Sequence, residues 1–170
     1  MATKKKAAKK RSTTKKRGAG PDILGRLRED HKAVKGLLEQ LENTTEKAAG
    51  KRVRLLEKIA KELRAHTTAE EETFYRPFRK AAESEDDEEM YYEANEEHHV
   101  VDLVLPEILA TDPASPKFGA KAKVLKELVE HHIKEEEREM FKSAREMFEK
   151  DKLRDMGDRF YMRKRALLKG

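Results

Sequence analysis

Apolar residues return at steps of three and four along four stretches of this chain, which is the spacing of one buried face of an α-helix. In the first stretch the apolar positions are Leu24, Leu27, Val34, Leu38 and Leu41, with mostly polar residues between them. The same pattern predicts helices over residues 22–42, 51–82, 84–110 and 115–148. We therefore expect four amphipathic helices.

Residues that start and end helices separate these stretches. Asp22, Ser84 and Ser115 each precede a stretch and can accept hydrogen bonds from its first free N–H groups. The connections around Asn43 and Asp112 are short and polar. Because short connections place consecutive helices antiparallel, the sequence predicts an all-α fold, an up-down-up-down four-helix bundle.

The composition agrees with an all-α protein. Apolar residues make up 36% and charged residues 43% of the 170 residues, as expected for one domain of helices with narrow apolar faces. Cysteine is absent, which excludes disulfides and thiolate ligands. No stretch approaches the ~18 apolar residues of a membrane span. No apolar segment follows the basic N-terminus, so we expect a cytoplasmic protein.

The charge is unevenly distributed along the chain. Residues 1–20 contain no acid and nine basic residues: Lys4, Lys5, Lys6, Lys9, Lys10, Arg11, Lys15, Lys16 and Arg17. Taking these nine from the 39 Lys and Arg residues leaves 30 against 34 Asp and Glu, so the remainder carries −4 within a net charge of +5. Residues 1–20 have almost nothing to bury and are predicted to be a disordered polybasic tail. Such a tail favours non-specific, salt-dependent contact with nucleic acid.

The chain becomes basic again beyond Phe148. Met156, Phe160 and Tyr161 are spaced for one face of a further short helix, and we expect this face to pack on the bundle. These changes in composition divide the chain into a tail (1–20), a four-helix bundle (21–150) and a basic C-terminal extension (151–170).

The six histidines fall at four places, one on each predicted helix. His31, His66, His98 and His132 all lie on the apolar faces. A single histidine on an apolar face is more often a satisfied core residue than a ligand. Their distribution over all four helices indicates instead that they meet inside the bundle, where facing side chains can form metal sites.

Two of these histidines are followed four residues later by a glutamate on the same helix face. The pairs are His66 with Glu70 and His132 with Glu136. A carboxylate that points into a core has to be paired or bind a cation, because an isolated buried charge is very costly. We therefore predict a buried site for two metal ions.

The pattern leaves several neighbouring residues as alternatives. They are His99 in place of His98, Asp102 as an added ligand, His131 with Glu135 in place of His132 with Glu136, and Glu137 in place of Glu136. Glu71 and Glu72 lie off the apolar face and are expected to be solvated. Pro77 is expected to kink the second helix just beyond the site.

Four strings in this order resemble the hemerythrin-like (HHE cation-binding) domains. They are Asp30-His31, His66-Thr-Thr-Ala-Glu70-Glu71, Glu96-Glu97-His98 and His132-Ile-Lys-Glu-Glu136-Glu137, within about residues 22–148. The resemblance implies a non-haem di-iron centre that binds O2 or a related small ligand such as NO. It implies as ligands His31, His66, Glu70, His98, His132 and Glu136, with the two glutamates as candidates to bridge the ions.

Two positions depart from the oxygen-carrying members of that family. Asp102 stands where they have a second histidine, and Glu136 or Glu137 stands where they have a more widely spaced aspartate. The more acidic set favours ferric iron, so redox or oxygen sensing, stress response or iron handling is expected rather than oxygen carriage. Manganese or zinc also suits imidazole and carboxylate ligands.

The alternative function is that of a nucleic-acid-associated protein that uses its Lys-rich tail, with the bundle as a scaffold. Nothing in the sequence indicates a substrate pocket with a positioned acid and base. A dedicated enzyme is therefore the less expected class. If the protein is an enzyme, we expect weak oxidase- or peroxidase-like activity at the iron site.

Overall fold

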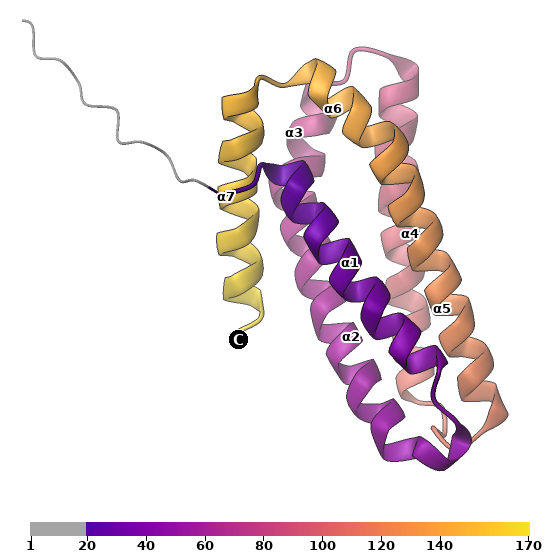
Figure 1. Ribbon diagram of the computed structural model, residues 1–170. Helices are drawn as coiled ribbons and strands as arrows, with labels where there is room; N and C mark the ends of the chain where they lie inside the picture. The colour runs from indigo at the N-terminus through magenta and orange to yellow at the C-terminus, as the bar shows by residue number, and fades with distance from the viewer. Residues whose placement is uncertain (1–19) are drawn as a thin grey trace, which may run out of the picture.

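The computed structural model describes residues 20–170 as a bundle of long helices (Figure 1). The nine basic residues of the expected tail lie outside the described residues. Four helical columns run alternately up and down, and residues 20–170 contain no β-strand. The columns are α1 (Ile23–Glu42), α2 (Ala49–Glu70) continued by α3 (Arg76–Ala81), α4 (Glu85–Leu109), and α5 (Pro116–Glu135) continued by α6 (Phe141–Met147). The predicted up-down-up-down bundle is confirmed.

The three predicted N-caps are also confirmed. The side chain of Asp22 accepts a hydrogen bond from the backbone N–H of Gly25 at 2.8 Å. Ser84 and Ser115 each accept one from the third residue of their helix, both at 3.2 Å. The second helix begins slightly earlier than expected, because a 3₁₀ turn at Glu46–Ala48 leads directly into α2.

The second and fourth columns each contain one π-helical turn. These turns span Glu71–Tyr75, between α2 and α3, and Glu136–Met140, between α5 and α6. The π-helical turn in the second column ends at Tyr75, two residues before Pro77, where a kink was expected. The second π turn contains no proline, so proline is not their common cause. Both turns adjoin a buried glutamate, and π turns concentrate at functional sites.

The core consists of two apolar clusters at different heights of the bundle. One cluster, at the lower end in Figure 1, includes Val34, Leu38, Leu56, Leu63, Val101, Leu105, Leu125, Val129 and Ile133. The other includes Ile23, Leu27, Phe74, Phe78, Ala94, Met140, Phe141, Met156 and Phe160. In the first three columns the buried histidine lies between residues of the two clusters, and in the fourth column Glu136 does. The fold thus holds a layer of polar side chains between two apolar halves.

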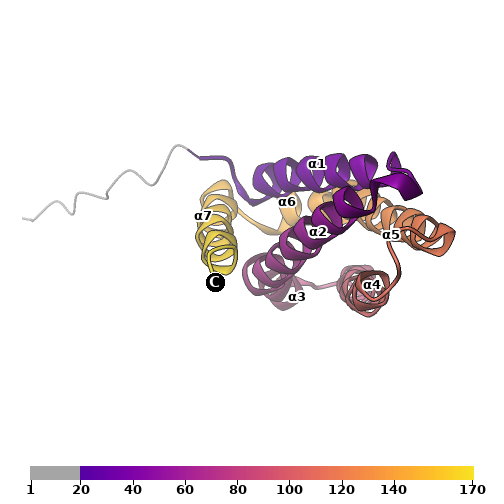
Figure 2. The same ribbon diagram turned by 90° about the horizontal axis from the view of Figure 1, so that it is seen from below.

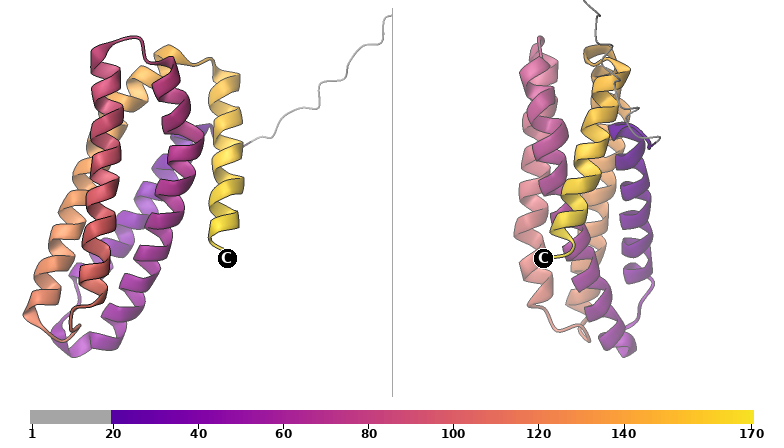
Figure 3. Two further views of the ribbon diagram at one scale, coloured as in Figure 1. Left: turned by 180° about the vertical axis from the view of Figure 1, so that it is seen from behind. Right: turned by 90° about the vertical axis from the view of Figure 1, so that its left-hand side faces the viewer.

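The C-terminal residues form α7 (Lys150–Leu167), which lies outside the four columns. It packs against α1 and α2, as the view from below (Figure 2) and the side view (Figure 3) show. Met156 and Phe160 are buried in this contact, as expected. Tyr161 is instead 46% exposed, and its ring lies under the guanidinium of Arg26 at 4.8 Å. None of the helices within residues 20–170 is long and apolar enough to cross a membrane.

The close approach of α7 to the start of α1 depends on Gly157. A Cβ atom at this position would lie 2.7 Å from the backbone nitrogen of Ile23 and 2.8 Å from the carbonyl carbon of Asp22. We therefore expect Gly157→Ala to lower the free energy of unfolding by about 1–3 kcal/mol, as overpacking does. The measurement is the midpoint of urea unfolding followed by circular dichroism.

The matched control is Gly36→Ala within α1, where an added Cβ meets no atom within 4 Å. This change is expected to raise the free energy of unfolding by about 0.5–1 kcal/mol, because alanine favours a helix interior over glycine. Equal midpoints for the two variants would show that α7 does not dock on α1 in this way.

Candidate metal centre

The six side chains predicted as ligands are all buried, and they come from all four columns. Their exposed fractions are 2% for His31, 4% for His66, 0% for Glu70, 5% for His98, 7% for His132 and 4% for Glu136. The alternatives His99, Asp102 and His131 are exposed. The inner face of α4 therefore presents His98, and that of the fourth column presents His132 and Glu136.

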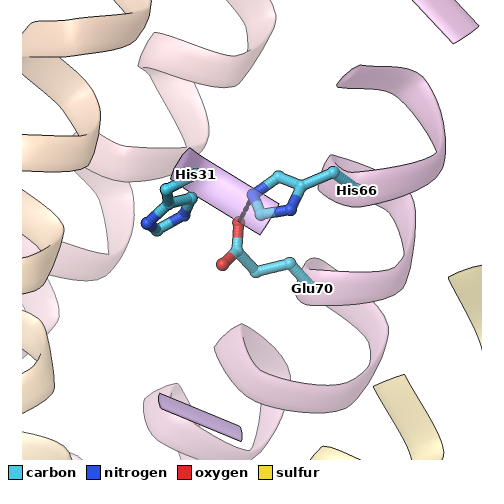
Figure 4. Close-up of side chains that lie close together, drawn as sticks. All are labelled: His31, His66 and Glu70. Atoms are coloured by element: carbon cyan, nitrogen blue, oxygen red, sulfur yellow. Dashed lines mark ion pairs between the residues drawn. The ribbon is translucent and has the colours of Figure 1, made fainter. Parts of the chain in front are cut away.

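The imidazole Nε2 atoms of three buried histidines contact the two buried carboxylates, and that of His132 lies 3.2 Å from Nε2 of His98. In the half shown in Figure 4, Nε2 of His66 lies 3.3 Å from Oε2 of Glu70, and His31 lies beside the pair. Nε2 of His98 is 3.5 Å from the same Glu70 oxygen. On the other side, Nε2 of His31 is 3.3 Å from Oε2 of Glu136.

Two three-residue groups in this layer have donor atoms close enough to hold one cation each. One group is His31, His66 and Glu70, and the other is Glu70, His98 and His132. Within each group the donor atoms lie within 4.8 Å of one another. Glu70 belongs to both groups, so its carboxylate is placed to contact two neighbouring cations.

The other ring nitrogen, Nδ1, of each buried histidine is hydrogen-bonded to a carboxylate. The distances are 2.8 Å from His31 to Glu137, 3.1 Å from His66 to Asp30, 3.0 Å from His98 to Glu71, and 2.7 Å from His132 to Glu97. A carboxylate only accepts hydrogen bonds, so Nδ1 is the donor in each pair. A neutral imidazole then has its lone pair on Nε2, directed into the layer, which is the arrangement of metal-ligating histidines.

These four carboxylates form a closed ring around the bundle. A carboxylate of each column accepts a hydrogen bond from the buried histidine of the next column, and a carboxylate of the fourth column accepts one from the histidine of the first. In order, the pairs are Asp30 with His66, Glu71 with His98, Glu97 with His132, and Glu137 with His31. Each histidine is thus oriented by the column that precedes it in this cycle.

Sequence reasoning missed this ring of carboxylates. Glu71 was expected to be solvated, and its side chain is 37% exposed, but its carboxylate also accepts a hydrogen bond from His98. Glu72 was also expected to be solvated, but it pairs with Arg163 of α7 at 2.7 Å. Each carboxylate of the ring does stand directly next to a predicted ligand in the sequence, for example Asp30 before His31 and Glu137 after Glu136. Adjacent helical residues diverge by about 100°, so these side chains point towards the neighbouring helix.

The buried carboxylates have unsatisfied polar atoms that fit a metal ion. Within residues 20–170, neither carboxylate oxygen of Glu70 or Glu136 has a hydrogen-bond partner, and Nε2 of His31 has none. Buried polar groups without partners are rare and costly. Two carboxylates and four imidazoles are together a donor set suited to iron, manganese or zinc. The residues present therefore fit a pair of bound cations.

Without metal, the two glutamates differ in protonation. Burial opposes ionisation of Glu70, but the imidazoles of His66 and His98 outweigh it and lower the pKa of Glu70. Burial and the neighbouring Glu70 carboxylate raise the pKa of Glu136 well above its usual range. Burial would lower the pKa of His66, but the carboxylates of Glu70 and Asp30 raise it to about 9. The metal-free layer at pH 7 therefore carries a proton on His66.

Helix α7 supports the His66 side of the layer. The ammonium group of Lys164, a residue only 9% exposed, pairs with Asp30 and lies 2.9 Å from Glu62. The ring of Phe160 meets that of His66 edge-on, with centroids 5.8 Å apart. Lys164 thus fixes the carboxylate that in turn orients His66.

A small apolar cavity adjoins the four histidines. It is lined by His31, Val34, Leu63, His66, Thr67, His98, Val101, Val129, His132 and Ile133 and has a volume of about 20 Å³. About 10–15 Å³ is enough for one water-sized molecule. The cavity therefore accommodates a ligand of two or three atoms next to the Nε2 atoms, and its apolar walls disfavour charged ligands.

The family description "Hemerythrin HHE cation binding domain" matches residues 22–144 of this chain. A crystal structure of a hemerythrin HHE cation-binding domain-containing protein from Mycobacterium kansasii has the same fold. The TM-score is 0.76 and the identity 24%, with 88% of this chain and 89% of that chain covered.

A curated protein from Nostoc sp. (strain PCC 7120), named a DNA nickase, is 30% identical over 119 residues. The match covers 70% of this chain but only 32% of the nickase. This chain therefore spans about a third of the length of that relative.

Metal binding is expected to release protons, because a cation at Nε2 of His66 displaces the proton held there by a pKa of about 9. At pH 7, binding of Zn²⁺ to metal-free protein should release at least one proton per chain. Isothermal titration calorimetry in buffers of different ionisation enthalpy measures this number. The apparent affinity should fall about tenfold per released proton for each pH unit below 9. His99→Ala should release the same number, and binding without proton release would contradict this protonation of the layer.

Proposed function

This chain belongs to the hemerythrin HHE cation-binding family, and we propose that it is a non-haem di-iron protein. The proposed ligands are His31, His66, Glu70, His98, His132 and Glu136. Bound iron would supply one-electron redox chemistry and an open coordination position for O2, NO or a similar small molecule. The protein would then serve in oxygen or redox sensing, stress response or iron handling.

The observation that carries this proposal is the orientation of the four buried histidines. Each Nδ1 is bound to a carboxylate of another column. Nε2 of His31, His66 and His98 faces a glutamate of the layer, and Nε2 of His132 lies 3.2 Å from Nε2 of His98. Histidines that only pack in a core need one hydrogen bond each for the protonated ring nitrogen, and their rings need not point towards a common site. Four imidazoles held in one direction around Glu70 and Glu136 instead form a pre-organised set of metal ligands.

The surroundings of the layer favour ferric iron and a small ligand. The two inner carboxylates are enclosed by the ring of Asp30, Glu71, Glu97 and Glu137. Negative charge at short distance in a partly buried site stabilises the more highly charged ion. Asp102 is exposed, so α4 directs one residue, His98, into the layer. The cavity of about 20 Å³ suits a diatomic molecule and excludes an organic substrate.

The test is the metal content of protein purified without oxygen. Wild-type protein should contain about two iron ions per chain, and a visible charge-transfer band should appear when air is admitted. Removing a residue that is hydrogen-bonded to a metal ligand typically lowers metal affinity about 10–100-fold, and removing the ligand itself should lower it at least as much. His98→Ala should therefore retain about one ion or fewer.

His99→Ala is the matched control, because it removes the adjacent, exposed histidine of the same helix. Its iron content and spectrum should equal those of the wild type. Folded wild-type protein without bound iron, or an unchanged iron content in His98→Ala, would exclude the proposed centre. Elemental analysis of the same samples identifies manganese or zinc if one of them is the resident metal.

Association with DNA is a second candidate function. It is supported by the name of the Nostoc relative and by the nine basic residues within positions 1–20. Two basic residues of α7 are less suitable, because Arg163 pairs with Glu72 and Lys164 with Asp30. We therefore assign DNA contact to the N-terminal residues.

Deletion of residues 1–19 should abolish the binding of a fluorescent duplex measured by anisotropy. For the full chain, six or more phosphate contacts predict a loss in affinity of about 10³-fold between 50 and 200 mM salt. The deleted protein should keep its metal content. Equal DNA affinity with and without these residues would reject this function, and conversion of supercoiled plasmid to the open circle tests for nicking.

A further inference from the structure

The outer face of the fourth column repeats the histidine–glutamate spacing of its inner face. His131 and Glu135 lie one residue before His132 and Glu136 and point to the surface. Nε2 of His131 is 3.5 Å from Oε2 of Glu135 and 3.7 Å from Oε1 of Glu97 on α4. These three donor atoms lie within 4.8 Å of one another. The three residues thus offer donor atoms close enough together for one cation.

The partners of these residues leave the three donor atoms accessible. On the outer side Arg138 lies 3.6 Å from the other oxygen of Glu135, Oε1. The side chains of His131, Glu135 and Glu97 are 59%, 31% and 23% exposed, respectively. A hydrated cation can therefore reach the cluster and exchange part of its water for one imidazole and two carboxylates.

A narrow cavity leads from this cluster to the metal centre. It is about 20 Å³ in volume, and its walls include Glu93, Glu97, Glu135, Glu139, His132 and Glu136. Glu136 is only 4% exposed, and neither of its carboxylate oxygens has a hydrogen-bond partner within residues 20–170. An unsatisfied buried carboxylate thus lines the same cavity that Glu97 and Glu135 border from outside.

A wider groove of about 660 Å³ continues outward from this cavity and is lined by residues at the start of α4 and on the fourth column. The two share Met90, Glu93 and Glu139. Six acidic and two basic side chains line the groove: Asp86, Asp87, Glu89, Glu93, Glu139 and Glu146, with Arg138 and Lys142. A cleft lined mainly by one sign of charge concentrates ions of the opposite sign.

Glu97 connects the outer cluster directly to the metal centre. Its Oε1 faces His131, while its Oε2 accepts the 2.7 Å hydrogen bond from Nδ1 of His132. One carboxylate therefore contacts the outer cluster and orients an inner ligand. A cation that binds Oε1 is separated from the inner layer by a single side chain.

We propose that Glu97, His131 and Glu135 form an outer site for a divalent cation, from which metal ions pass along the acidic cavity to Glu136 and His132. The outer site binds weakly, because it has three protein ligands and an exposed imidazole. The transfer step rests on the proposed metal centre, whereas binding at the outer site does not.

Binding at the outer site is tested with Mn²⁺, whose free form is measured by its electron paramagnetic resonance signal. Wild-type protein should bind one weak equivalent beyond the tightly bound ions. His131→Ala and Glu135→Gln should each lose this equivalent, while His99→Ala, which removes an exposed histidine outside any such cluster, should keep it. Absence of the weak equivalent in the wild type, or its retention in both variants, would overturn the proposal.

Transfer is tested by loading metal-free protein with Fe²⁺ under anaerobic conditions and stopping the reaction with a fast ferrous chelator. Inner iron is protected from the chelator, so protected iron against time gives the loading rate. His131→Ala and Glu135→Gln should load about tenfold more slowly, the lower limit of electrostatic focusing by a charged cleft. All variants should reach the same final content. Equal loading rates would overturn the proposed transfer. Absence of protected iron in the wild type would instead overturn the proposed inner centre, and the Mn²⁺ titration would then still decide whether the outer site exists.

Discussion

The burial of two carboxylates and four imidazoles in the middle of a helical bundle is the constraint on which this structure depends. Isolated charges in such a place are very costly, and removing one member of a buried ionic set typically costs about 3–5 kcal/mol. The four outer carboxylates satisfy Nδ1 of each buried histidine, whereas within residues 20–170 the carboxylate oxygens of Glu70 and Glu136 have no hydrogen-bond partner. The imidazoles of His66 and His98 favour the ionised form of Glu70, but the carboxylate oxygens of both glutamates are still placed to bind cations.

The remaining architecture keeps this layer in place. Apolar clusters above and below it supply the burial that stabilises the four columns. Since the carboxylates link consecutive columns in a closed cycle, a displacement of one column would disturb a histidine of the next. Helix α7 adds Lys164 behind Asp30 and Phe160 beside His66. The C-terminal helix is thereby part of the environment of the metal centre, although it lies outside the bundle.

The periodicity of the sequence was sufficient to predict the four helices, their N-caps and the burial of His31, His66, His98 and His132. These features depend on local chemistry and on which face of a helix is apolar. The partners of the histidines could not be predicted, because a contact such as that between Glu71 and His98 depends on the relative height of two helices. The π turns, and the exposure of Tyr161 on α7, are likewise set by packing between elements. The ligand set itself stays a prediction, supported by its geometry.

Consecutive residues on a helix point in directions about 100° apart, and this chain places ionisable pairs at such positions in every column. In each column one residue of such a pair faces the layer and its neighbour orients a histidine of another column, as Glu70 and Glu71 do. In the fourth column His131 and His132 extend the arrangement outward, since Glu97 contacts both of them through different oxygens. A carboxylate shared in this way makes the orientation of an inner ligand depend on what occupies the surface. In the proposed route, cation entry and the geometry of the centre would therefore be linked through the side chain of Glu97.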